Sequence, residues 1–83
     1  METTDLLKRG DKVTVIIYGP DDEKLYTLTG DDFHTLDSAV KESIEKADLT
    51  TNPENCVFEV RNDTRDVSHR YRINAHGHLK LIV

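Results

Sequence analysis

The sequence predicts an α+β domain: a single helix packed on one face of a five-stranded antiparallel or mixed sheet, with the element order ββαβββ. One stretch, residues 33–47, has apolar residues at steps of three and four, which form one stripe along a helix. The other apolar runs have the spacing of strands. Because 83 residues suffice for one domain, we expect that domain at 12–83, after a short segment 1–11 that can form one helical turn.

The predicted helix has a buried stripe and a charged face. The stripe consists of five apolar residues: Phe33, Leu36, Val40, Ile44 and Ala47. On the opposite face Glu42 precedes Lys46 by four residues, which is the favourable order for an ion pair. Either Asp32 or Thr35 can cap the first turn, because each side chain has an oxygen that can accept a hydrogen bond from a free amide. A helix this short is not stable alone in water, so it needs a sheet to pack on.

The first two strands, 12–18 and 24–29, form a predicted hairpin. A four-residue loop at 20–23 places Tyr26 opposite Ile17, so that one face of the hairpin is apolar and meets the helix. The other face points away from the helix and carries three apolar residues among threonines, with no evident cover. We treat these three as a candidate apolar interface: Ile16, Tyr18 and Leu25.

The last three strands form a predicted meander over 56–61, 68–74 and 78–83. A three-residue loop at 75–77 sets Ile73 opposite Leu79, and a four-residue loop at 63–66 sets Glu59 opposite Arg70. The inner face then consists of apolar side chains: Cys56, Phe58, Val60, Tyr71, Ile73, Leu79, Leu81 and Val83. The element order leaves the strand order open, including an arrangement in which the last strand runs beside the first.

Charge is distributed unevenly along this acidic chain. The formal net charge of -5 argues against general, charge-driven binding to nucleic acid or to an anionic membrane. Residues 1–55 contain 13 acidic and 6 basic residues, whereas residues 56–83 contain 3 acidic and 5 basic ones. Four of the five arginines lie in that last part of the chain. A local basic surface is therefore expected on the meander.

The predicted basic surface lies on the outer face of the meander, which points away from the helix. We interpret it as a candidate site for a partner or an anion, formed by Arg61, Arg70, Arg72, His78 and Lys80. Several guanidinium groups on one flat face can hold carboxylates or phosphates in bidentate fashion. The alternative is a solvated face on which Glu59 neutralises Arg70. Nucleic acid is the weaker ligand, because no outer position of the meander has an aromatic ring on which bases could stack.

The residues that often carry catalysis or bind metal show no recognisable pattern, so we predict no enzyme, no cofactor and no metal site. Cys56 is the only cysteine, and its inward register predicts a buried apolar residue rather than a nucleophile. His76 and His78 flank a predicted turn and need not share a face, and no helical metal-binding spacing is present. Neither a phosphate-binding glycine loop nor a nucleophile elbow occurs.

These observations predict a small, non-catalytic protein-binding or regulatory module that acts through the open face of its sheet. A cytoplasmic location is expected, since the N-terminus does not resemble a signal peptide and the longest apolar run, residues 15–18, is far too short for a membrane span. The alternative function is a binder of a small anionic ligand or nucleic acid through the arginine-rich face. Self-association as a homodimer through a sheet edge or the apolar residues is also expected, unless Leu6 and Leu7 cover the latter.

Overall fold

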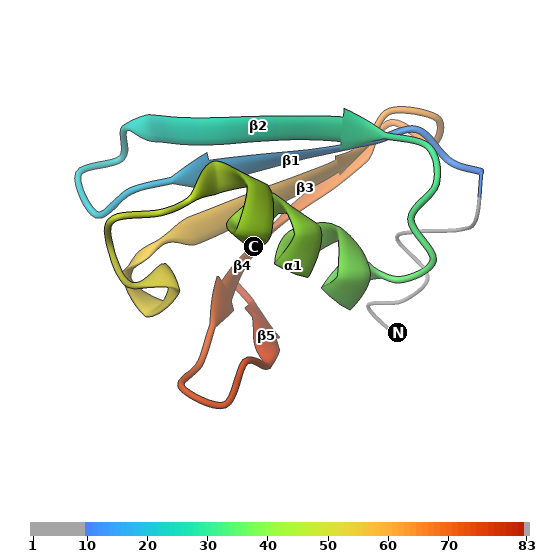
Figure 1. Ribbon diagram of the computed structural model, residues 1–83. Coiled ribbons are helices and arrows are strands. Elements are labelled where there is room, and N and C mark those ends of the chain that lie inside the picture. Colours follow the sequence, from blue (N-terminus) through green and yellow to red (C-terminus); the bar gives the residue numbers. More distant parts are fainter. Residues whose placement is uncertain (1–9, 83) are drawn as a thin grey trace.

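The structure is a computed structural model that describes residues 10–82. It contains one α-helix and one five-stranded sheet in the predicted order ββαβββ (Figure 1). The elements are β1 (Val13–Tyr18), β2 (Lys24–Gly30), α1 (Leu36–Ala47), a short 3-10 turn η2 (Pro53–Asn55), β3 (Val57–Asn62), β4 (Val67–Ile73) and β5 (Leu79–Leu81). No helix among residues 10–82 is long and apolar enough to cross a membrane.

The strands follow the order β2-β1-β3-β4-β5, and every neighbouring pair is antiparallel. The sheet is therefore not mixed, and β5 lies at an edge beside β4 rather than beside β1. Short turns join β3, β4 and β5 in sequence, so the chain has no crossover that could return β5 to β1. The one crossover is made through α1, which takes the chain from β2 to β3 on the other side of β1.

The helix begins at Leu36, three residues later than the apolar stripe predicted. Thr35 is the N-cap, and a reciprocal capping box fixes it: Ser38 N–H donates to Thr35 Oγ1 at 3.0 Å, and Thr35 N–H donates to Ser38 Oγ at 3.1 Å. Asp32 is not the cap. Phe33 precedes the helix but is still buried, with 6% of its surface exposed. The stripe therefore identified the core residues correctly while placing the helix boundary too early.

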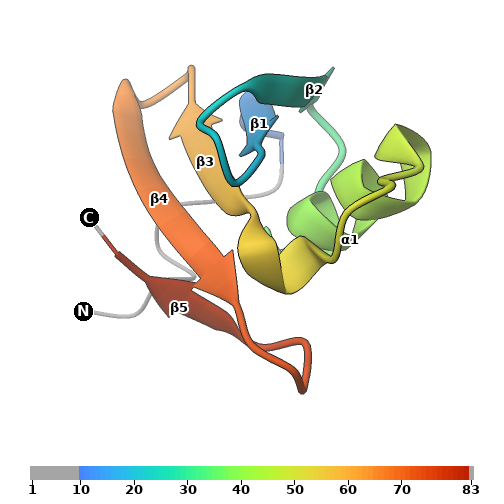
Figure 2. The same cartoon turned by 90° about the vertical axis from the view of Figure 1, so that its left-hand side faces the viewer.

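The helix covers one face of the sheet, chiefly over β1 and β2, and the core lies between them (Figure 2). Alternate residues of the central strands are fully buried, as the predicted strand pattern requires. The principal core side chains come from β1, α1, β3 and β4: Val13, Val15, Ile17, Leu36, Val40, Phe58, Val60 and Tyr71. Ile44 and Ala47 are half-buried against this core, at its margin.

Both predicted hairpin registers of the meander are confirmed. Glu59 lies opposite Arg70, and Ile73 lies opposite Leu79, with Gly77 at a φ of 81° in the connecting turn. The β4–β5 hairpin extends past the helix (Figure 1). Leu81 is 49% exposed although it pairs with the buried Tyr71, so its predicted place in the core is wrong. Val83 lies outside the described residues.

The first hairpin has the predicted register over most of its length. Ile17 pairs with Tyr26, but a bulge after Ile17 then shifts the ladder so that Tyr18 pairs with Lys24. Gly19 N–H donates to the carbonyl oxygen of Glu23 at 2.8 Å and closes the turn. The bulge arises at the end of the hairpin, where this tight turn leaves one residue more on one strand than on the other.

A buried polar cluster fixes the start of β1 to the β3–β4 turn. Asn62 is fully buried, and its Nδ2 donates to Asp11 Oδ2 at 2.8 Å. Arg65 Nε donates to the same carboxylate oxygen at 2.7 Å, and Arg65 N–H donates to Asn62 Oδ1 at 3.1 Å. Asp11 is thus part of the packed domain. The predicted N-terminal helical turn falls mostly on residues 1–9, outside the described residues.

Candidate functional site

The strand registers place the predicted basic residues on the outer face of the sheet, which we define as the face that α1 does not cover. Arg61 and Glu59 lie on β3, Arg70 and Arg72 on β4, and Lys80 on β5. Pairing sets Glu59 opposite Arg70 and Arg72 opposite Lys80. The alternation of side chains along each strand therefore gathers these charges on one surface, as predicted.

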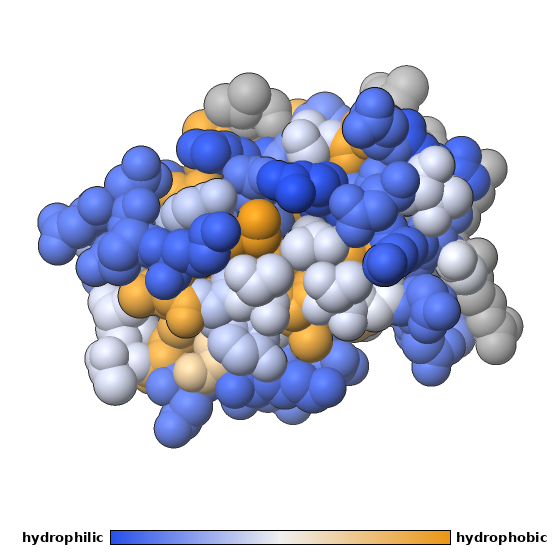
Figure 3. Space-filling view, turned by 90° about the horizontal axis from the view of Figure 1, so that it is seen from above, coloured by the Kyte–Doolittle hydropathy of each residue, from blue (hydrophilic) through white to orange (hydrophobic). Residues whose placement is uncertain are grey.

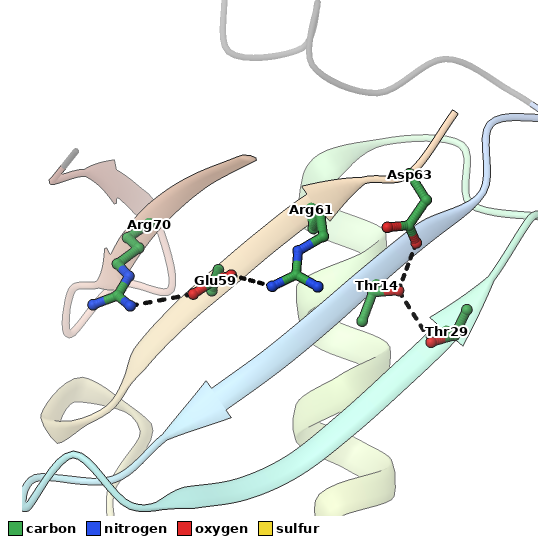
Figure 4. A network of polar contacts seen from close by, with 6 residues as sticks. All are labelled: Thr14, Thr29, Glu59, Arg61, Asp63 and Arg70. Atoms are coloured by element: carbon green, nitrogen blue, oxygen red, sulfur yellow. Dashed lines mark hydrogen bonds and ion pairs between the residues drawn. The ribbon is translucent and has the colours of Figure 1, made fainter. Parts of the chain in front are cut away.

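Glu59 is the centre of an ion cluster on this face (Figure 4). One carboxylate oxygen, Oε2, accepts a hydrogen bond from Arg61 Nη2 at 2.9 Å, and Oε1 lies 3.3 Å from Arg70 Nη2. Only 8% of Glu59 is exposed. The guanidinium carbon of Arg70 also lies 5.3 Å from the centre of the Tyr18 ring, within cation–π range. Two of the three arginines on this face are thus engaged within the protein.

A hydrogen-bonded polar row continues the outer face towards β2. Thr14 Oγ1 donates to Asp63 Oδ2 at 2.7 Å and shares a second hydrogen bond of 3.1 Å with Thr29 Oγ1 (Figure 4). These contacts satisfy the polar groups locally, and the one charged member, Asp63, is an anion. The outer face consequently changes along its width, from threonines at β1 and β2 to cations at β4 and β5.

Arg72 and Lys80 differ from the other cations of this face. They lie directly opposite each other on neighbouring strands, and both are exposed. Among residues 10–82, neither has a carboxylate oxygen within 4.0 Å of its nitrogens. Like charges directly opposite each other destabilise a sheet, whereas a carboxylate between them would be attracted by both. This pair is the part of the predicted site that is ready to bind an acidic group.

His78 lies at the start of β5, next to this pair, where its backbone is held by the turn. Asn74 Oδ1 accepts hydrogen bonds from the backbone N–H groups of His76 and His78, both at 2.9 Å. The two imidazole rings are 6.3 Å apart between centroids. Within the described chain no group of three histidine, cysteine or acidic side chains is placed to hold a metal ion. The His78 side chain is exposed beside the basic surface.

The candidate apolar interface is only partly present. Ile16 is 5% exposed, so the prediction that it lacks cover is wrong; it lies between Thr27 of β2 and Glu59 of β3. Tyr18 is half-buried, and Leu25 is 40% exposed. Seen from the β2 side, hydrophilic side chains cover most of the surface, and apolar ones show as small separate areas (Figure 3). The alternative cover, Leu6 and Leu7, falls outside the described residues.

Cys56 is fully buried in the core next to β3, as its register predicted. Burial raises the pKa of its thiol, and the negative charge of Glu23 raises it further. Burial likewise raises the pKa of the Tyr71 phenol. Both groups are therefore held in their neutral, less nucleophilic forms at neutral pH.

Comparison with known proteins gives no match: no family model, no curated protein and no solved structure resembles the chain significantly. The interpretation of this face therefore depends on its own chemistry.

Sequence reasoning missed the exposure of Leu81, a large apolar side chain beside the Arg72–Lys80 pair. Leu81 and Ile82 have 49% and 47% of their surface exposed at the end of β5. The relevant signal was the strand order, because β5 is an edge strand and has a neighbouring strand of the described chain on one side only. The buried Asp11–Asn62–Arg65 cluster was also missed, because nothing in the local sequence pairs positions so far apart.

Proposed function

We propose that this protein is a small, non-catalytic binding module that recognises an acidic segment of a partner protein through the outer face of β4 and β5. The observation that carries the proposal is the Arg72–Lys80 pair, two cations held opposite each other with no carboxylate partner in residues 10–82. Arg61 and Arg70 form a contrast on the same face, since Glu59 already neutralises them. A carboxylate supplied by a partner would do the same for Arg72 and Lys80.

A small anionic ligand or nucleic acid is the alternative for the same two cations. Among the described residues of the outer face, Tyr18 is the one tyrosine or phenylalanine, and Arg70 already lies over its ring. The described outer face therefore offers unpaired bases no free tyrosine or phenylalanine ring on which to stack. The net charge of -5 also repels a long polyanion, while a short acidic segment can approach the basic edge alone. These points favour an acidic protein segment.

A cytoplasmic setting belongs to the same proposal, because the lone cysteine Cys56 is a free, buried thiol and forms no disulfide. Self-association remains a prediction. A second copy of the chain would compete with the partner for β5. The oligomeric state of the free chain tests whether such self-association occurs.

The test is a titration of the full chain with a glutamate-rich peptide, followed by backbone amide NMR and repeated at several salt concentrations. We expect shifts at Arg72 and Lys80, with an affinity that falls as salt rises. Lys80→Glu should weaken binding about tenfold or more, because it replaces attraction by repulsion at the site. Lys41→Glu is the matched control: Lys41 is an exposed lysine of α1, and the same change in total charge there should alter affinity only about twofold.

Two results would overturn the proposal. Equal losses for Lys80→Glu and Lys41→Glu would mean that only total charge matters. Tighter binding of nucleotides or single-stranded DNA than of the peptide, with the same two residues shifted, would replace the protein partner with the anionic-ligand alternative.

A further inference from the structure

Within residues 10–82, the outer edge of β5 has backbone groups that no other strand pairs with. β5 pairs with β4 only, and no other strand of the described chain lies beyond it. Asn74 N–H donates to the carbonyl oxygen of His78 at 2.9 Å, and Ile82 N–H donates to that of Arg70 at 2.8 Å. Antiparallel ladders alternate in this respect, so the residues between, Leu79 and Leu81, direct their N–H and C=O groups away from β4. These groups form an open template for another strand.

The side chains beside this edge differ between the two faces of the sheet. On the outer face Lys80 stands next to Arg72, with no carboxylate partner among the described residues. On the inner face Leu79 is partly buried against the core, and Leu81 is half exposed. A strand added here would therefore have cations beside one of its faces and leucines beside the other.

We propose that the acidic partner segment binds as a sixth, antiparallel strand on the edge of β5. Its acidic side chains lie on the outer face beside Lys80 and Arg72, and its apolar side chains lie on the inner face beside Leu79 and Leu81. The expected ligand is thus an extended segment in which acidic and apolar residues alternate. This inference rests on the proposed function and specifies how the same site recognises its partner.

Charge distinguishes this ligand from a second copy of the chain. Antiparallel pairing of β5 with its own copy would continue the sheet and place two Lys80 and two Arg72 side chains on one outer face. Such like charges oppose the pairing. Lysine on an edge strand is also a common barrier to unspecific edge pairing. Lys80 therefore rejects basic or self-complementary strands while attracting an acidic one, which gives the edge its specificity.

The opposite edge of the sheet, β2, also has an exposed lysine and leucine, Lys24 and Leu25, but its backbone and local charge differ. β2 begins at Lys24 with a bulge at its pairing with Tyr18, directly after an acidic turn at residues 21–23. The bulge disturbs the edge that an added strand would need, and the turn repels carboxylates. The charge of the molecule thus selects the β5 edge for an acidic segment.

The decisive experiment uses the full chain and a capped synthetic peptide in which glutamate alternates with valine, with and without backbone N-methylation. In an antiparallel strand whose glutamates face outward, the valine N–H groups point to β5 and the glutamate N–H groups point to solvent. Methylation of the valine amides should weaken binding about tenfold. Methylation of the glutamate amides, the matched control, should change it little. A peptide of the same composition with its glutamates in one block should also bind more weakly.

A protein variant gives an independent reading. Leu81→Pro removes an N–H group from the open edge without removing a bond of the β4–β5 ladder, and it should abolish the peptide-induced NMR shifts at Lys80. If this variant does not give a folded spectrum, the methylated peptides on the natural chain still decide the question.

Each remaining outcome has a defined meaning. Binding that depends on Lys80 but responds equally to both methylation patterns overturns strand addition and leaves the proposed function intact. A loss confined to glutamate methylation would indicate a parallel strand and overturn the proposed orientation. Absence of peptide binding overturns both proposals. Sedimentation of the free chain as a dimer that the peptide dissociates would make a second copy the natural occupant and overturn the choice of partner.

Discussion

Removal of the negative charge of Glu59 should strengthen the binding of an acidic segment. Glu59→Gln keeps the shape of the side chain and an acceptor for the arginines, but it raises the formal charge of the cluster Glu59, Arg61, Arg70, Arg72 and Lys80 from +3 to +4. It also frees Arg61 and Arg70 from an anion to which they are now bound. In the natural protein, Glu59 thus limits the attraction of the outer face for an acidic segment.

The size of the effect follows from the spacing of side chains on one face of a strand. Alternate residues are roughly 7 Å apart, so a carboxylate bound at Arg72 lies about 7 to 10 Å from Glu59. One unit charge at that distance in water contributes about 0.5 kcal/mol, which corresponds to a two- to threefold gain in affinity. The gain should decline as salt is added, since the Debye length is about 8 Å at physiological ionic strength.

The folded state should tolerate the change. The side chains of Arg61 and Arg70 are 49% and 47% exposed, and ion pairs of such exposed groups contribute about 0 to 1 kcal/mol each. Because Glu59 makes two such pairs, we expect a decrease of no more than about 2 kcal/mol in the free energy of unfolding. Urea titration measures this value, and calorimetric titration with the alternating glutamate peptide measures the affinity.

The matched control is Glu45→Gln, which makes the same change of total charge at an exposed residue of α1. It should leave the affinity nearly unchanged. Equal gains for both variants would attribute the effect to total charge and refute the role of the face. Weaker binding by a stably folded Glu59→Gln would refute the reasoning directly, because it would mean that Glu59 helps to present the arginines rather than masking them.

Two further predictions concern the stability of the domain. Asn62→Ala should reduce the free energy of unfolding by about 2 to 4 kcal/mol, because Asp11 and Arg65 both lose a buried hydrogen-bonding partner. Urea titration measures this loss, with Asn55→Ala, a change at an exposed asparagine, as the control. Equal unfolding midpoints for the two variants would contradict the prediction. The raised pKa of the Cys56 thiol means that the folded state retains this proton more strongly than the unfolded state does, so its contribution to stability is complete below the ordinary thiol pKa and is lost as pH rises. Urea titrations at neutral and alkaline pH should thus show that the free energy of unfolding falls as pH rises, and that it falls less in Cys56→Ala. An equal fall in both proteins would assign the pH dependence to other groups.

The sheet registers could be predicted because they depend on alternation within short loops. A slip of one residue at the β4–β5 turn would have paired Arg72 with the apolar row of β5, so the sequence excluded it. The same logic placed Glu59 opposite Arg70, as the structure confirms. Local pattern therefore determined which side chains share a face, and with it most of the predicted basic surface.

The strand order and the outer limits of the core could not be predicted in this way. Whether Leu81 is covered depends on where α1 ends relative to β5, which the local sequence does not specify. Ile16 showed the reverse case: it alternates onto the outer face, yet it is 5% exposed between its neighbours on β2 and β3. Exposure of a residue on an open sheet face thus depends on the cross-strand side chains around it as well as on its own register.

Because of these two differences, the proposed binding site is the edge formed by β4 and β5 rather than the whole predicted arginine row. The predicted arginine row treated all its members alike, but the structure separates them into a pair bound by Glu59 and a pair without an acidic partner among the described residues. Of the unneutralised pair, Lys80 lies on the edge strand β5 and Arg72 on its neighbour β4, and Leu81 and Ile82 are also exposed at this edge. Charge, apolar surface and open backbone groups coincide at this edge, and a ligand must satisfy all three at once. An extended acidic segment does so, whereas a small anion would use the cations and leave the leucine and the strand edge unused.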